Sequence, residues 1–185
     1  MKIITGLGNP GEKYESNRHN VGILFAKWLN DKISNESQKE GKPWKKDSTN
    51  SFFSVKHEGF VLAYPNNFMN LSGIAVGKLV KQFGATLPND LFVAHDDLDI
   101  LLGKFKIEIG RGPKLHNGLS SIEDHLHTKD FVRIRIGVDA RDPANRLPGE
   151  TYVLQDFADS ELEILKGVFA EIFPKIDLYH PLVTT

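Results

Sequence analysis

The order of hydrophobic patterns along the chain constrains the fold more than any other feature of this sequence. A short apolar run at 2–7 predicts a strand. A helical pattern follows, with Val21, Phe25 and Trp28 among the apolar residues that recur every three or four positions. The alternation continues along the chain, and 185 residues with 40% apolar content suffice for one sizeable core. These features predict an α/β fold, a single three-layer domain over residues 1–185 with a twisted mixed β-sheet flanked by helices.

Turns and helix-ending residues mark the other expected elements. Apolar runs at 52–57 and 60–65 flank a Glu-Gly pair and predict a β-hairpin. A helical pattern follows the hairpin and ends at Gly84, while the polar stretch 34–51 predicts an exposed connection. Further strands are expected at 91–95, 104–109 and 132–138, a short helix near 119–126 and a final helix through 162–172.

Composition excludes several classes of protein. The chain has no cysteine, which excludes disulfide frameworks, thiolate metal sites and cysteine nucleophiles, and fits a reducing, cytoplasmic location. The N-terminal apolar run is too short for a secretory signal, and no stretch approaches the roughly 20 apolar residues that span a bilayer, so no membrane association is expected. The net charge is -1. A nucleic-acid partner would therefore need a local basic patch.

Polar side chains gather where the predicted strands end. Asn9 follows the first strand, Asn70 follows the hairpin, Asp96 ends the strand "LFVAH", and His116 and Asn117 precede the short helix. In open α/β sheets, ligands bind outside the carboxyl ends of the strands, so these loops are expected to converge on one site. Each of these residues alone also fits a turn or a helix N-cap, and that local interpretation stays open.

His19 is the strongest catalytic candidate. It lies at a helix start, where the positive end of the helix dipole favours a neutral imidazole, whereas a carboxylate at Asp96 would favour the imidazolium, so the net pKa is undecided. There is no GxSxG motif and no cysteine, which indicates water as the nucleophile of a His–Asp pair. This pattern favours hydrolysis, although a histidine that only caps or packs fits the residues equally well.

Four basic residues alternate with apolar ones in two predicted strands. Lys104 and Lys106 share one strand face, and so do Arg133 and Arg135. If the two strands are neighbours with aligned faces, the four cations form a patch suited to phosphate. A solvated outer face of the sheet explains the same pattern.

Several motifs together resemble one known family. "GLGNPGEKYESNRHNVG", "NNFMNLSG", "VAHDDLD", "HNGLSSI" and "RIRIGV" are similar, in order and spacing, to the bacterial-type peptidyl-tRNA hydrolases. The resemblance implies a monomeric α/β enzyme of the cytoplasm that uses no metal or cofactor. Its partner would be peptidyl-tRNA, whose peptide ester it would cleave to recycle tRNA dropped by ribosomes.

The resemblance also implies roles for residues of the catalytic cleft. His19 matches the general base that activates water, and Asp96 the carboxylate that supports it. Asn9 would distinguish N-blocked from free aminoacyl groups. Asn70 and Asn117 would bind the peptide–ester end and position water.

Further residues are implied in binding the substrate. Tyr14 and Phe68 would line the cleft, where aromatic faces suit a terminal nucleotide or a peptide. Lys106 and Arg135 match positions implied in clamping tRNA phosphate.

The chain departs from the family pattern in two places. The loop 110–116 reads "GRGPKLH" instead of a glycine- and serine-rich run, and Pro113 stiffens it, which puts the presentation of Asn117 in question. Asn17 stands where threonine is usual, and little effect is expected.

Two other functions remain as hypotheses. The altered loop is compatible with a tRNA-binding domain whose catalysis is impaired. A metal-dependent amidohydrolase or peptidase could use "HDD" together with His116 and the "HLH" of His125 and His127. The last two are two positions apart and would not face the same way on a helix, which weakens this hypothesis.

Overall fold

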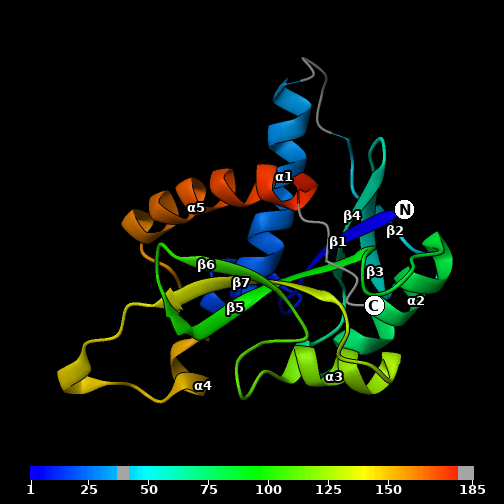
Figure 1. The fold of residues 1–185 in the computed structure, drawn as a ribbon. Helices are drawn as coiled ribbons and strands as arrows, with labels where there is room; N and C mark the ends of the chain where they lie inside the picture. The colour runs from blue at the N-terminus through cyan, green and yellow to red at the C-terminus, as the bar shows by residue number, and fades with distance from the viewer. Residues whose placement is uncertain (37–41, 179–185) are drawn as a thin grey trace.

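A seven-stranded mixed β-sheet forms the centre of the molecule. The computed structural model describes residues 1–36 and 42–178 (Figure 1). The strand order is β2-β3-β4-β1-β5-β7-β6, in which β4, β1, β5 and β7 run parallel and β2, β3 and β6 pair antiparallel to their neighbours. The strands are β1 (Lys2–Gly6), β2 (Lys45–Lys46), β3 (Phe52–Lys56), β4 (Phe60–Pro65), β5 (Leu91–Leu101), β6 (Phe105–Ile109) and β7 (Val132–Asp139).

Helices cover both faces of this sheet and confirm the predicted three-layer α/β architecture. α1 and α5 pack on one face and α2 and α3 on the other (Figure 1). No helix within the described ranges is long and apolar enough to cross a membrane. The α-helices are α1 (Val21–Glu36), α2 (Ser72–Phe83), α3 (Asn117–Leu126), α4 (Gly149–Tyr152) and α5 (Asp159–Leu178); the 3-10 helices are η1 (Glu12–Tyr14), η2 (Arg18–Asn20), η3 (Met69–Leu71) and η4 (Pro143–Asn145).

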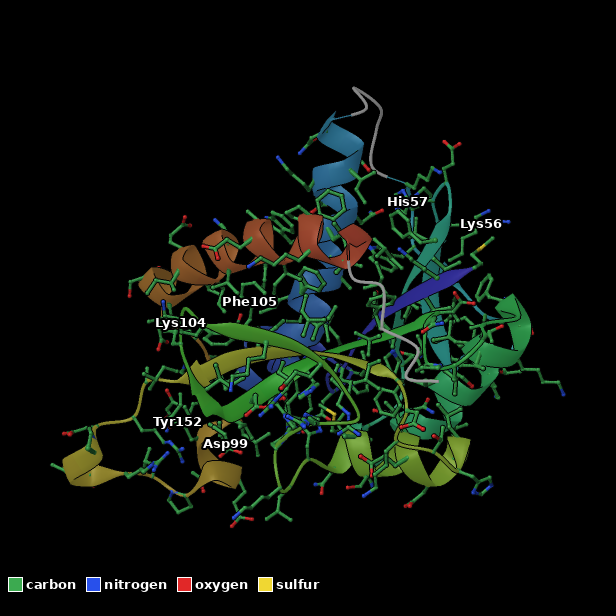
Figure 2. The ribbon with its side chains drawn as sticks, in the orientation of Figure 1. Lys56, His57, Asp99, Lys104, Phe105 and Tyr152 are labelled. Carbon is green, nitrogen blue, oxygen red and sulfur yellow. The ribbon has the colours of Figure 1, made fainter. Side chains whose placement is uncertain are left out.

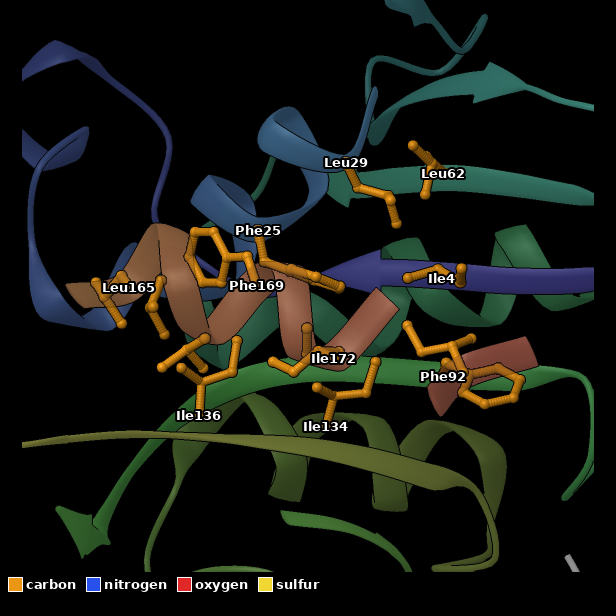
Figure 3. Close-up of a cluster of buried hydrophobic side chains, with 14 of the residues drawn as sticks. Ile4, Phe25, Leu29, Leu62, Phe92, Ile134, Ile136, Leu165, Phe169 and Ile172 are labelled. Atoms are coloured by element: carbon orange, nitrogen blue, oxygen red, sulfur yellow. The ribbon is translucent and has the colours of Figure 1, made fainter. Parts of the chain in front are cut away.

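Two apolar cores hold the layers together. On one face, Phe25 of α1 and Phe169 of α5 pack edge to face, with ring centroids 5.4 Å apart, over strand residues such as Ile134 (Figure 3). On the other face, Val76 of α2 and Ile122 of α3 are fully buried against β1 and β5. Successive strand residues point to opposite faces, and helices bury both faces of the central strands. The sequences of these strands are therefore continuous apolar runs.

The hairpin and the predicted helices are confirmed, but β5 is longer than expected. β3 and β4 pair antiparallel, and Gly84 ends α2 in the left-handed conformation, with φ of 61°. β5 continues through Leu101 instead of ending near His95, because its acidic residues find buried partners. The exposed connection predicted at 34–51 contains the end of α1 and β2, and 37–41 lie outside the described residues.

Close packing of α1 on the sheet requires glycine at position 22. A Cβ atom there would lie 2.3 Å from the carbonyl oxygen of Ala94 and 2.5 Å from the backbone nitrogen of Leu7. We expect Gly22→Ala to lower the free energy of unfolding by at least about 1–3 kcal/mol, measured by denaturant titration. The control Gly167→Ala, in α5 with nothing near its Cβ, should raise it by about 0.5–1 kcal/mol. Equal values for the two variants would contradict this packing argument.

Candidate active site

The loops that follow β1, β4 and β5 converge with the start of α3 on one cleft. It has a volume of about 870 Å³ and lies at the carboxyl edge of the parallel strands. The cleft brings together six of the nine residues to which the resemblance assigns a role: Asn9, His19, Phe68, Asn70, Asp96 and Asn117. It is also lined by the loop 113–116 and by part of the segment 148–154.

A buried carboxylate holds two imidazole rings at the floor of the cleft. Oδ1 of Asp96 lies 2.7 Å from Nδ1 of His19 and 3.1 Å from Nε2 of His116. An ionised carboxylate only accepts hydrogen bonds, so the ring nitrogens that face it carry the protons. Neutral His19 therefore has a lone pair on Nε2. His19 is 12% exposed and lines the cleft, so this base can reach a bound water.

The protonation of His116 is fixed by the backbone. Its Nδ1 accepts hydrogen bonds from the N–H groups of Gly118 and Leu119 and thereby caps α3. The proton of its neutral ring must then sit on Nε2, the atom that faces Asp96. His116 thus connects the start of α3 to the carboxylate of Asp96, a role that the sequence alone did not assign. The signal for it was the position of His116 shortly before the helix predicted near 119–126.

The charge of Asp96 decides the basicity of His19. Burial lowers the pKa of His19, but the charge of Asp96 and the hydrogen bond to it raise the pKa by more, so it lies above the ordinary 6.5. Burial also opposes ionisation of Asp96, and the two histidines outweigh this and hold its pKa well below the usual range. The pKa of His19, whose net shift the sequence left undecided, is therefore raised.

The segment that carries His19 is anchored to the C-terminal part of the chain. The backbone N–H of His19 donates to the carbonyl of Val153 at 2.8 Å. Arg18 is buried between the rings of Tyr152 and Phe157, and it pairs with Glu161 at 2.8 Å. These contacts fix the direction in which His19 enters the cleft.

Asn17 joins the segment that carries His19 to the segment that precedes α5. It is buried, and its amide nitrogen donates to Oδ1 of Asp156 at 2.6 Å. The two residues also form an isolated β-bridge. Asn17 therefore helps attach the segment that carries His19.

The amide of Asn9 is oriented by its neighbours. Its Oδ1 accepts from the backbone N–H of Met69 at 2.8 Å, and its backbone carbonyl accepts from the side chain of Asn20 at 2.9 Å. The amide nitrogen is left as a donor at the wall of the cleft, because the oxygen is already used. Asn70, in η3, and Asn117, the first residue of α3, are exposed at the same cleft.

The position of Asn117 is set by the start of α3. The N-cap made by His116 sets the start of α3, and Asn117 follows it directly. Leu115 of this loop is 92% exposed and Pro113 also lines the cleft. The loop thus changes the wall of the cleft, while the position of Asn117 depends on the helix cap.

The two aromatic candidates are in contact with each other. Phe68 is 54% exposed and lines the cleft. Tyr14 meets Phe68 edge to face, with centroids 6.4 Å apart, but does not itself line the cleft. Tyr14 therefore supports Phe68 from behind.

The expected patch of four cations does not form. β6 and β7 are neighbours, and Lys106 lies opposite Arg135, so the two basic pairs share one face of the sheet as the patch would need. Arg135, however, is 9% exposed and bonds to Asp97 at 2.7 Å and Glu108 at 2.6 Å. Arg133 is buried too, and it pairs with Glu123. Lys104 and Lys106 are exposed, so only the lysines present unshared charge.

Of the residues proposed for a metal-dependent enzyme, Asp96 and His116 come together, but Asp97, His125 and His127 do not join them. Asp96 and Asp97 point to opposite faces of β5, and Asp97 binds Arg135 on the face away from His19. Within the described ranges, one group of three possible ligands occurs, and it is His19, Asp96 and His116 themselves. The "HLH" histidines, His125 and His127, are not part of it.

The fold and this cleft fit one class of protein, the hydrolases built on a three-layer α/β sheet, because a carboxylate-held histidine lies beside amide donors in the cleft. A sequence model of the family described as peptidyl-tRNA hydrolase matches residues 3–180. The chain belongs to the peptidyl-tRNA hydrolase family.

Individual relatives agree with this assignment. The chain is 39% identical to the peptidyl-tRNA hydrolase of Pseudothermotoga lettingae, over 96% of this chain and 89% of the relative. It is also 39% identical to that of Lawsonia intracellularis, over 96% of this chain and 86% of the relative. The crystal structure of peptidyl-tRNA hydrolase from Acinetobacter baumannii superposes with a TM-score of 0.79 at 31% identity, covering 96% of this chain and 87% of that one.

Proposed function

We propose that this chain hydrolyses the ester bond between a peptide and the 3′ end of tRNA, with His19 as the general base. Membership of the peptidyl-tRNA hydrolase family supports the substrate. The observation that carries the mechanism is the 2.7 Å bond from His19 to buried Asp96, which leaves Nε2 free at the cleft.

The proposed reaction begins with a water molecule beside Nε2 of His19. The ring takes a proton as the water oxygen attacks the ester carbonyl, and Asp96 stabilises the imidazolium that forms. Collapse of the tetrahedral intermediate breaks the bond to the ribose oxygen, which receives the proton from His19. The products are a peptide with a free carboxylate and tRNA with a free 3′ hydroxyl.

Amide donors would hold the acyl group during this reaction. Asn9, with its oxygen already bonded to Met69, is suited to donate to a carbonyl of the substrate. Asn70 and Asn117 lie at the same cleft and would bind the peptide–ester end and position the water. Phe68, backed by Tyr14, offers an aromatic face to the terminal nucleotide or the peptide.

The remaining assignments concern partners and location. Lys106 is the exposed cation of the Lys106–Arg135 pair and would contact tRNA phosphate, whereas Arg135 mainly holds Asp97 and Glu108. We infer that the chain acts as a monomer of one domain in the cytoplasm, where peptidyl-tRNA is produced.

The proposal is tested with purified protein and two substrates, N-acetyl-aminoacyl-tRNA and the same aminoacyl-tRNA unblocked. We expect the blocked ester to be cleaved rapidly, the free one slowly, and EDTA to have no effect. Loss of activity in EDTA would identify a metal-dependent hydrolase instead. Binding of tRNA without turnover would identify a tRNA-binding domain that has lost catalysis.

A further inference from the structure

Exposed apolar side chains gather in the cleft that holds His19. Among the described residues, eight large apolar side chains are exposed, and three of them, Phe68, Leu115 and Leu154, line this cleft. Leu115 is 92% exposed and Leu154 51%, so each leaves at least half of its surface open to a ligand. Exposed apolar surface is unfavourable in water, and where it is grouped in a concave site it indicates a binding surface for apolar groups.

The two leucines belong to the segments that lie against His19. Leu115 directly precedes His116, whose ring centroid lies 5.1 Å from that of His19. Leu154 directly follows Val153, whose carbonyl accepts from the backbone N–H of His19 at 2.8 Å. Consecutive Cα atoms are about 3.8 Å apart, so each leucine begins one residue away from a neighbour of His19. Both leucines therefore lie near the position of an ester that reacts beside this histidine.

Leu115 belongs to the loop in which this chain departs from the family pattern. The run 110–116 reads "GRGPKLH" where a glycine- and serine-rich run is usual. Glycine and serine present little or no apolar side chain to a ligand, whereas leucine presents a large one. The departure thus gives the cleft of this chain an apolar group that the family pattern does not supply.

The charges beside these leucines disfavour a nucleic-acid backbone. Asp99, near the end of β5, and Glu150 of α4 both line the cleft, together with one lysine, Lys114. Asp99 and Tyr152 of α4 lie at the same side of the molecule (Figure 2). Like charges repel, so the two carboxylates disfavour phosphate at this wall. The uncharged acyl part of an ester suits the leucines better than the RNA does.

We propose that Leu115 and Leu154 form an apolar subsite for the side chain of the esterified amino acid, so that the chain prefers peptides that end in an apolar residue. The inference rests on the proposed function, because it assumes an acyl ester beside His19. It adds selectivity to that function. The amides of the cleft suit backbone groups that every peptide carries, whereas the leucines contact the side chain that differs from one peptide to the next.

The test uses one tRNA that carries N-acetyl-leucine, N-acetyl-alanine or N-acetyl-aspartate, so that only the side chain differs between substrates. For the wild-type chain we expect kcat/KM to be about 10-fold higher for the leucyl ester than for the aspartyl ester, with the alanyl ester between them. Equal values for the three esters would overturn the proposal.

Variants of the two leucines locate the preference. Leu115→Ser and Leu154→Ser remove apolar surface at exposed positions, so the fold should tolerate both changes. We expect each to reduce the ratio of kcat/KM for the leucyl over the alanyl ester several-fold. Leu115→Met keeps an apolar side chain of similar size and should retain the preference.

Leu101→Ser is the matched control. Leu101 is also exposed, at the end of β5, but it does not line the cleft, so the variant should keep the wild-type ratio. If Leu115→Ser and Leu154→Ser lower kcat/KM equally for all three esters, the leucines contact the tRNA or the shared part of the ester, and the proposal is wrong.

The outcome also separates this inference from the function itself. If the wild-type protein cleaves none of the three esters, the proposed function fails and the subsite fails with it. If it cleaves all three and the two serine variants agree with Leu101→Ser in the leucyl-to-alanyl ratio, the function stands and the apolar subsite is wrong.

Discussion

His19→Ala is expected to lower kcat for N-acetyl-aminoacyl-tRNA by about 10²–10⁴-fold, the range that a positioned general base contributes. The reason is geometric, because no other imidazole in the described residues joins the cleft with a free nitrogen. His116 uses Nδ1 to cap α3 and Nε2 to bond Asp96. Its ring therefore cannot replace that of His19 without breaking the cap.

The fold and tRNA binding should survive this change. Asp96 keeps its hydrogen bond from His116, so the buried carboxylate is not left without a partner. The measurements are single-turnover hydrolysis, the dissociation constant for deacylated tRNA, and thermal unfolding. His125→Ala, at an exposed position of α3, is the matched control and should behave as wild type. A His19→Ala protein with substantial turnover would overturn the general-base assignment.

The sequence predicted the layers of the fold well because hydrophobic periodicity records which side of each element is buried. The same signal failed at β5. The residues after His95 are mostly acidic and suggest a loop, yet Asp96 and Asp97 are buried within the strand. Their partners lie far away in the sequence, at His19 and Arg135, and no local pattern encodes such pairs.

The candidate site shows the same limit. The rule that ligands bind outside the carboxyl ends of the strands correctly predicted that these loops meet at one cleft, because the ends of parallel strands lie at one edge of the sheet. The conditional patch of four exposed cations is not seen, because strand alternation indicates the face on which a side chain lies but not its counter-charge. Glu108, on the same strand as Lys106, lies within bonding distance of Arg135 and neutralises it. The sequence offered His116 as a possible helix N-cap or metal ligand, but not as the residue that connects the start of α3 to Asp96, because that connection depends on the tertiary structure.

Asp96→Asn separates the charge of the carboxylate from its geometry. Oδ1 of Asp96 faces two ring N–H groups, one of His19 and one of His116. The helix cap made by Nδ1 of His116 fixes the proton of that ring on Nε2. The amide oxygen introduced by the substitution is therefore held toward both rings, and His19 keeps its proton on Nδ1 and its lone pair on Nε2. The substitution removes only the negative charge that stabilises the imidazolium.

We expect Asp96→Asn to lower kcat by about 10²–10⁴-fold and to move the pH profile downward. The base works in its neutral form, so wild-type kcat/KM rises with pH through a pKa above 6.5. Without the charge of Asp96, burial dominates and lowers the pKa of His19, so the midpoint of the rise shifts to lower pH. The measurement is kcat/KM from pH 5 to 9 for both proteins. The shift is expected because a carboxylate 2.7 Å from Nδ1 stabilises the imidazolium, and the substitution removes that charge. A midpoint that stays at the wild-type value would show that Asp96 does not set the basicity of His19.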